Sequence, residues 1–421
     1  MPFTHTKELP KYGGRASFQF QVSEPSSAVP SPHPTPRPTR RGFVKQREEQ
    51  KQKAMAKAGE AAKAAKATAV VKQETEEEEQ GKEKEKIGFD KLEHEGKEDV
   101  ALSRLAASGG SPQKVQVAGV EVWFWSAEVM SAMPKGILFL AHGANHGAYD
   151  FFSPREVHGG VGLPEERAIV RAARRRGYAC ACISSINRRS KRWIGEVDGP
   201  RVARALSALA EAFTMPVHAL GISNGGRFVF DLTLYMKVEA MCIQIMALDH
   251  DILGEFMNQK AFPGRVCFAH MPRDTDCASA VHADVGALRS DEVLSGRAVK
   301  VFDLRPLALN DAFFADRLPL MYHCTKAAGL DLGRDLIKAL RARHFIDAED
   351  QLTSDPRRST WRGTVRPILA KHGVVTDSLV ADESPVAEIL NVAYGLHECT
   401  STEIDAVLSF LLDEEKEEED E

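Results

Sequence analysis

One pentapeptide constrains this chain more than any other feature. Gly221-Ile222-Ser223-Asn224-Gly225 is the only G-x-S-x-G in the sequence, and it lies between an apolar run at 216–220 and a helical pattern at 225–236. In so tight a strand-to-helix turn, small residues must flank the serine, and its hydroxyl stands above the end of the sheet. The string alone is weak evidence, but this position makes Ser223 a candidate nucleophile.

The rest of the chain alternates between strands and helices from residue 113 onwards. Residues 114–125 alternate apolar and polar side chains, which favours a half-buried strand or hairpin, and 136–141 is a continuous apolar run typical of a buried parallel strand. Further strands are predicted at 178–184, 216–220, 240–248 and 265–270, and helices at 164–176, 200–213 and 225–236. This order predicts an α/β fold with a mostly parallel, twisted sheet and helices on both faces.

The two ends of the sequence have a different composition. Residues 26–42 are rich in Pro, Ser and Thr, and 46–86 are mostly Lys, Glu, Gln and Ala, so we expect a disordered, charged region over 1–112. Basic residues outnumber acids in the first 47 positions, which suggests either an organelle transit peptide or a generic tail. The acidic end 413–421 is predicted to be solvated. The expected location is cytoplasmic or organellar.

Composition narrows the classes of partner and cofactor. A net charge of −5 offers no general attraction to nucleic acid, and no apolar run is long enough for a transmembrane segment. We interpret the basic residues at 174–176 and 188–192 as a solvated helix end and loop. The seven cysteines include no CxxC pair, which favours reduced thiols. The sequence contains no P-loop, dinucleotide fingerprint or metal-ligand spacing, so neither a cofactor nor a metal is expected, and it does not indicate an oligomeric state.

A second motif points to a family. Leu140-Ala141-His142-Gly143-Ala144-Asn145 follows the apolar strand 136–141. A strand that ends in His-Gly, with G-x-S-x-G about eighty residues later, resembles the α/β-hydrolase superfamily. The resemblance spans 114–412 and is strongest over 136–274.

The resemblance implies roles for several of these residues. The backbone N–H of Ala144 (or Gly143) and that of Asn224 would hold the negative oxygen of a tetrahedral intermediate. Gly221 and Gly225 would allow the turn. His142 would support its loop rather than transfer protons, and His146 would either do the same or be exposed.

An acid is expected later in the chain, near the end of another strand. Asp274, in the loop after strand 265–270, is our choice, and Asp276 is the first alternative. Asp249 and Asp251, after the preceding strand, form a third option. The competing interpretation is that these aspartates only cap helices.

The family places the base in a loop before the last helix. His397 fits this position, because 401–412 is predicted to be a final amphipathic helix, and His372 is the alternative. If 384–396 were itself helical, the His397 ring could be buried or misdirected, which would make it a structural histidine.

The chain departs from most relatives in where its extra residues lie. Most relatives carry their lid between the serine and the acid, whereas here the extra material, about 297–378, follows the acid. We expect a helical cap within a domain spanning 113–412, with helices at 332–343 and 362–371. Phe302, Phe313 and Phe314 are candidate pocket or core aromatics.

The resemblance implies a cofactor-free serine hydrolase that cleaves a small carboxylic ester. Ser223 would form the acyl-enzyme, His397 would act as the base and Asp274 would orient it. Thioester and peptide cleavage remain open. The alternative is a non-catalytic α/β-hydrolase-fold protein that binds a ligand or a partner, because a fold does not determine function.

Overall fold

The computed structural model describes residues 111–128, 134–157, 160–248, 253, 262–290, 298–374 and 379–414. The predicted N-terminal region 1–112 and the acidic tail 413–421 lie outside these ranges, except for residues 111–112 and 413–414. Among the described residues, no helix is both long enough and apolar enough to cross a membrane.

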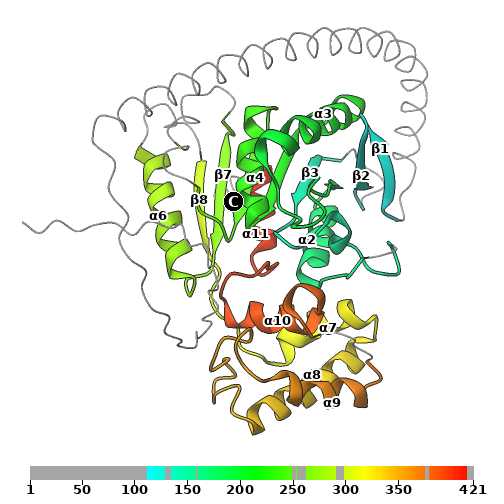
Figure 1. The fold of residues 1–421 in the computed structure, drawn as a ribbon, viewed down its shortest axis with the longest axis vertical. Coiled ribbons are helices and arrows are strands. Elements are labelled where there is room, and N and C mark those ends of the chain that lie inside the picture. The colour runs from blue at the N-terminus through cyan, green and yellow to red at the C-terminus, as the bar shows by residue number, and fades with distance from the viewer. Residues whose placement is uncertain are drawn as a thin grey trace, which may run out of the picture. The chain divides into compact units, whose positions relative to one another are not determined.

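The centre of the fold is an eight-stranded sheet (Figure 1). The strands lie in the order β1-β2-β4-β3-β5-β6-β7-β8. β1 and β2 pair as an antiparallel hairpin, β2 is antiparallel to β4, and all the other neighbours are parallel. The strands span β1 (Gln113–Val117), β2 (Val120–Trp125), β3 (Gly136–Ala141), β4 (Tyr178–Cys182), β5 (Val217–Ile222), β6 (Ala240–Gln244), β7 (Arg265–His270) and β8 (Ala298–Asp303).

The burial of each strand follows from its sequence pattern. β3, β5 and β6 are continuous apolar runs and are buried along their whole length, as strands covered on both faces should be. β1 alternates polar and apolar residues and is buried mainly at its end. The predicted mostly parallel sheet is therefore confirmed.

Helices cover both faces of the sheet and form two hydrophobic layers. One layer includes residues of α3, α4 and α6, and the other includes residues of α2 and α11. Two short 3₁₀ segments, η1 (Ala148–Phe151) and η2 (Leu232–Leu234), complete this part of the chain. The helices span α2 (Pro164–Arg175), α3 (Gly195–Phe213), α4 (Asn224–Asp231), α6 (Thr275–Ser290) and α11 (Ile404–Leu412).

The end of α2 corrects one expectation. Proline and two glutamates begin this helix, and arginines occupy its last turn, so its ends match the helix dipole. Arg174, however, is buried rather than solvated. Its guanidinium lies 3.8 Å from the centre of the Trp125 ring and donates to the carbonyl of Ser126. A cation on an aromatic face can be buried where a hydrogen bond also satisfies it, and sequence periodicity does not reveal such a contact.

A separate group of helices follows β8. Figure 1 shows α7, α8, α9 and α10 gathered beyond one end of the sheet. They share their own hydrophobic cluster, in which Trp361 and Phe314 are almost completely buried. We call residues 304–396 the helical unit. Its elements are α7 (Asp311–Tyr322), α8 (Lys326–Ala342), α9 (Arg362–Lys371), η4 (Ala381–Glu383) and α10 (Pro385–Tyr394).

The boundaries of this unit differ from the predicted insertion at 297–378. Residues 298–303 form β8, the last strand of the main sheet, so Phe302 belongs to the main core. Phe313 and Phe314 pack in the core of the helical unit, with their ring centroids 5.3 Å apart. β8 is mostly only partly buried and Lys300 interrupts its apolar residues, so it lacks the continuous apolar run that predicted the buried strands.

Candidate active site

The pentapeptide forms a strained turn between β5 and α4. Ser223 has φ 52° and ψ −117°, a conformation that is costly for a residue with a side chain. A Cβ on Gly221 would lie 2.1 Å from the carbonyl oxygen of Gly225. A Cβ on Gly225 would lie 2.3 Å from the carbonyl oxygen of Ala141, at the end of β3. Both glycines are therefore required by close backbone approach.

Three side chains that are far apart in the sequence form a hydrogen-bonded relay. Ser223 Oγ lies 3.0 Å from Nε2 of His397. On the other side of the ring, Nδ1 lies 2.6 Å from Oδ2 of Asp274. Because a carboxylate accepts hydrogen bonds, Nδ1 carries the proton and Nε2 is left to accept from the serine hydroxyl. This arrangement can take a proton from Ser223 and stabilise the charged ring that results.

The other candidate acids and the other candidate base either make contacts elsewhere in the fold or lie outside the described residues. Asp276 is in the first turn of α6, and His372 Nε2 lies 2.8 Å from Asp335 within the helical unit. Asp249 and Asp251 lie outside the described residues. The structure thus brings Asp274 and His397, and not Asp276 or His372, to Ser223.

His397 reaches the serine because α10 stops before it. The helix begins at Pro385 and ends at Tyr394, followed by Gly395 with φ 73°. The stretch 384–396 is therefore largely helical, but a left-handed glycine ends the helix, as is common at this position. The next turn places His397 at φ 46° in an exposed loop, with 45% of its side chain accessible.

Arg357, from the loop between α8 and α9, holds this histidine loop in place. Its guanidinium donates to the carbonyls of Leu396 and His397, each at 2.8 Å, and to the Glu398 carboxylate at 2.9 Å. Nothing in the local sequence around Arg357 links it to a loop so far away, so the sequence did not reveal this role.

The two backbone N–H groups predicted to hold the negative oxygen have no acceptor among the described residues. They belong to Asn224, the first residue of α4, and to Ala144, in the loop after β3. The neighbouring amide of Asn145 is engaged with the carbonyl of Ser190, which fixes this loop. The Asn224 side chain accepts from the N–H of Trp193 at 2.7 Å.

His142 is a buried, neutral part of the loop after β3. Its Nδ1 donates to the Gly143 carbonyl at 2.8 Å, and its Nε2 accepts from the N–H of Ser185 at 3.0 Å. Burial lowers the pKa of His142 to about 3. Both ring nitrogens are therefore occupied by loop contacts, which leaves no proton-transfer role.

Trp193 is a supporting residue that the sequence did not reveal. Its Nε1 donates to the carbonyl of His142 at 2.8 Å, and its ring stacks on Phe228 of α4 at 4.2 Å. It therefore connects the loop after β3 to the helix that begins at the serine.

His146 is partly buried, and its pKa shifts in the opposite direction to that of His142. Burial opposes its charged form, but the adjacent Asp150 carboxylate and the nearby charges of Glu166 and Asp382 raise its pKa to about 9. Its Nδ1 lies 3.5 Å from Asp150 Oδ2, and its Nε2 lies 4.0 Å from Asp382 of the helical unit. His146 thus lies between a carboxylate of the loop after β3 and one of the helical unit, and it connects the two.

Buried carboxyl groups lie behind the histidine loop. Burial raises the pKa of Glu398 to about 7, against the effect of Arg357. Burial also raises the pKa values of Glu166 and Glu388, which interact with each other. One oxygen of each of these two carboxyl groups has no donor among the described side chains, and a proton shared between them would satisfy both.

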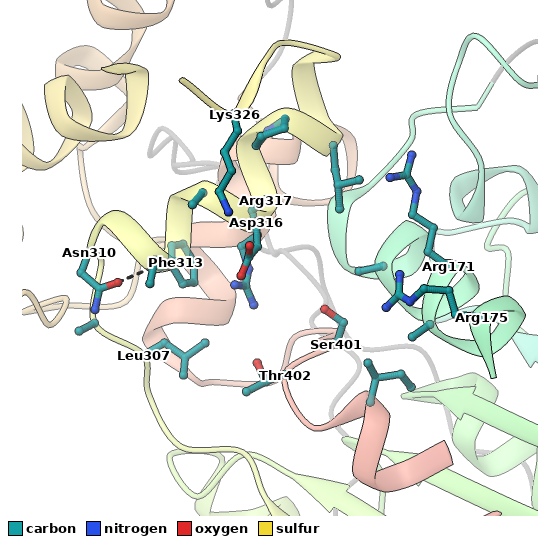
Figure 2. Close-up of a pocket in the computed structure, with 18 residues that line it drawn as sticks. Arg171, Arg175, Leu307, Asn310, Phe313, Asp316, Arg317, Lys326, Ser401 and Thr402 are labelled. Atoms are coloured by element: carbon teal, nitrogen blue, oxygen red, sulfur yellow. Dashed lines mark hydrogen bonds between the residues drawn. The ribbon is translucent and has the colours of Figure 1, made fainter. Parts of the chain in front are cut away.

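One cavity in the described part of the chain is separate from the relay. It has a volume of about 750 Å³ and lies between α2, α7 and the start of α11 (Figure 2). Figure 2 shows Arg171 and Arg175 on one side and Lys326 on the other, with Ser401 between them. None of the three relay residues lines it. Phe313, one of the candidate pocket aromatics, contributes to its wall.

Comparison with known proteins identifies distant structural neighbours. TT1662 from Thermus thermophilus is 17% identical, with a TM-score of 0.33 over 52% of this chain and 94% of that one. XC6422 from Xanthomonas campestris, described as an α/β serine hydrolase without a lid, is 14% identical, with a TM-score of 0.31 over 55% and 95%. The esterase Est2 from Thermogutta terrifontis is 13% identical, with a TM-score of 0.31 over 47% and 82%. No family model and no curated protein matches the sequence.

The fold itself defines the class of protein. A mostly parallel eight-stranded sheet with an antiparallel second strand, and a serine at the sharp turn between β5 and α4, constitute the α/β-hydrolase fold. The chain is an α/β-hydrolase-fold protein whose helical unit follows the last strand.

Proposed function

We propose that this protein is a serine hydrolase that cleaves small carboxylic esters through an acyl-enzyme on Ser223. The observation that supports this most strongly is the continuous relay from Asp274 through His397 to Ser223. The strained turn supports it further, because backbone strain persists where the surrounding structure holds it and is concentrated at active sites.

In the first half of the reaction, His397 takes the proton of the Ser223 hydroxyl at Nε2 as the oxygen attacks the ester carbon. Asp274 accepts from Nδ1–H and stabilises the resulting imidazolium without taking its proton. The negative oxygen of the tetrahedral intermediate accepts from the N–H groups of Asn224 and Ala144, with Gly143 as the alternative to Ala144. The C–O bond to the alcohol then breaks, and the alcohol leaves with the proton from Nε2.

In the second half, water replaces the alcohol. His397 takes a proton from the water as it attacks the acyl carbon of the ester on Ser223. The same two N–H groups hold the second tetrahedral intermediate. Collapse of that intermediate returns the proton from Nε2 to Ser223 Oγ and releases the carboxylic acid. No cofactor enters either half.

A fluorophosphonate probe tests this proposal, because it reacts only with an activated serine. We expect the full chain to be labelled, Ser223→Ala to remain unlabelled, and the exposed-site control Ser290→Ala to be labelled as wild type. Hydrolysis of p-nitrophenyl acetate should follow the same pattern. A folded wild-type protein that neither reacts with the probe nor cleaves the ester would overturn the proposal in favour of a non-catalytic binding protein. Parallel assays with a thioester and an aminoacyl anilide identify the preferred acyl bond.

A further inference from the structure

Three side chains with metal-binding atoms meet at the ends of β7 and β8. His270 is the last residue of β7, and the parallel register places it opposite Asp303, the last residue of β8. Strand alternation puts both side chains on the face of the sheet that α6 covers, and His282 lies on α6. Two strands and one helix therefore contribute one potential ligand each.

The three side chains are close enough to share one ion. One ligand atom from each lies within 4.8 Å of the others. His270 Nε2 lies 3.0 Å from Asp303 Oδ1, and the rings of His270 and His282 have centroids 5.0 Å apart at an angle of 81°. Zinc–nitrogen and zinc–oxygen bonds are about 2.0–2.2 Å long, so two ligands of one ion lie up to about 4 Å apart. His282 and Asp303 are exposed and can make the small adjustment that remains.

A second observation points to a ligand here. The His270 residue is 99% buried, because only 1% of its surface is exposed. Neither of its ring nitrogens makes a satisfactory hydrogen bond to any described residue. Buried polar groups are almost always paired, so an imidazole left in this state requires an explanation.

A simple ion pair with Asp303 does not provide that explanation. The carboxylate lies near Nε2, but the geometry does not satisfy either nitrogen. An ion pair between His270 and Asp303 also does not explain why the His282 ring lies beside the His270 ring. A cation between the three groups accounts for all of them, since it takes a lone pair from each histidine and a carboxylate oxygen.

We propose that His270, His282 and Asp303 bind a divalent transition-metal ion, with zinc as the best fit. Two imidazoles and one carboxylate are borderline and hard ligands that suit zinc, and the exposed side of the cluster leaves room for water as a fourth ligand. The ion would join the ends of β7 and β8 to the middle of α6, and its ligand His270 lies four residues before Asp274. The sequence did not reveal this site, because its three ligands follow no motif spacing.

Titration of the full chain with Zn²⁺ tests the proposal. The protein is prepared without a histidine tag and dialysed against a chelator, and binding is followed by calorimetry and by the visible spectrum of Co²⁺ in its place. We expect one saturable site. His282→Gln and Asp303→Asn change exposed residues and should each weaken zinc binding at least about tenfold. His344→Gln, an exposed histidine in the helical unit, should bind as wild type.

Zinc binding is measured without any catalytic assay, so a failure to bind zinc is distinguishable from a failure of the proposed hydrolase activity. An affinity for Zn²⁺ that is unchanged in both His282→Gln and Asp303→Asn would overturn the assignment. A wild-type protein that binds Zn²⁺ no better than the variant with both substitutions would overturn it as well. His270→Gln provides a third comparison, with circular dichroism to verify that this buried variant folds.

Discussion

Arg357 donates a hydrogen bond of 2.8 Å to the carbonyl oxygen of His397, across 40 positions of the chain. The arginine belongs to the helical unit, and the histidine belongs to the loop that reaches Ser223. Their contact makes the helical unit a support for the relay. Its effect on catalysis can be measured.

Replacing Arg357 should lower turnover more than it weakens substrate binding. In Arg357→Met the two carbonyls lose their donor and Glu398 is left buried without its cation, so the His397 loop is less well fixed. A small misplacement of a catalytic group is costly, and we expect kcat to fall at least about tenfold with little change in KM. Steady-state ester hydrolysis measures this. The neighbouring Arg358 is 90% exposed, so Arg358→Met should match wild type. Equal losses in both variants would contradict a positioning role.

The two candidate acids can be separated by conservative substitution. Asp274→Asn keeps the shape but presents an amide to Nδ1, which favours the wrong tautomer of His397, and we expect kcat to fall by about 10⁴. Asp276→Asn changes a residue in the first turn of α6 and should retain nearly full activity. A larger loss in Asp276→Asn than in Asp274→Asn would reverse the assignment of the acid.

The glycines of the turn should not tolerate a methyl group. In Gly225→Ala the new Cβ would meet the backbone at 2.3 Å, and we expect the free energy of unfolding to fall by at least about 2 kcal/mol. Urea denaturation provides the measurement. Gly286 in α6 is the matched control, because a Cβ there meets nothing within 4 Å. Gly286→Ala should stabilise the helix by about 0.5–1 kcal/mol, and a loss of stability there would contradict the described packing.

Stability should decline as the pH rises from about 7 to 9, above the range in which the lowered pKa of His142 has the opposite effect. Burial raises the pKa of Glu398 to about 7 and also raises those of Glu166 and Glu388. The folded protein therefore keeps protons that the unfolded chain releases, and each such proton lowers stability by about 1.4 kcal/mol per pH unit. The raised pKa of His146, about 9, acts in the same direction: its contribution is complete below pH 6.5 and is lost as the pH passes 9.

Glu388→Gln tests this pH dependence. The amide can donate to Glu166 but cannot ionise, so the free energy of unfolding should fall less steeply with pH than in wild type. Urea denaturation between pH 7 and 9 measures the slope. Glu403→Gln, at an exposed position, should leave the slope unchanged. A parallel decline in wild type and Glu388→Gln would show that this pair does not titrate as described.

Local sequence was sufficient for most of the central sheet and for the turn. Continuous apolar runs predicted β3, β5 and β6, and the glycines of the pentapeptide predicted the close approach found at Ser223. Chain order brought Asp274 and His397 into consideration, but periodicity could not choose between them and their alternatives. The choice of His397 depends on where α10 ends, and Gly395 ends it.

The parts that were missed depend on contacts between distant residues. Trp193 supports the loop after β3 through a hydrogen bond to His142, and Arg357 holds the His397 loop. Neither residue differs from an ordinary loop residue in its local pattern. The edge strand β8 was missed because Lys300 interrupts its apolar residues and the strand is mostly only partly buried, and α7 because it contains Pro319.

The position of the helical unit in the chain also has a consequence for biosynthesis. Ser223 and Asp274 precede this unit, whereas His397 follows it. A ribosome therefore completes the sheet strands, the nucleophile and the acid well before the base emerges. If the hydrolase proposal holds, a nascent chain stays inert until the helical unit and the histidine loop have been made. A fragment released before that point contains Ser223 but not the histidine that would activate it.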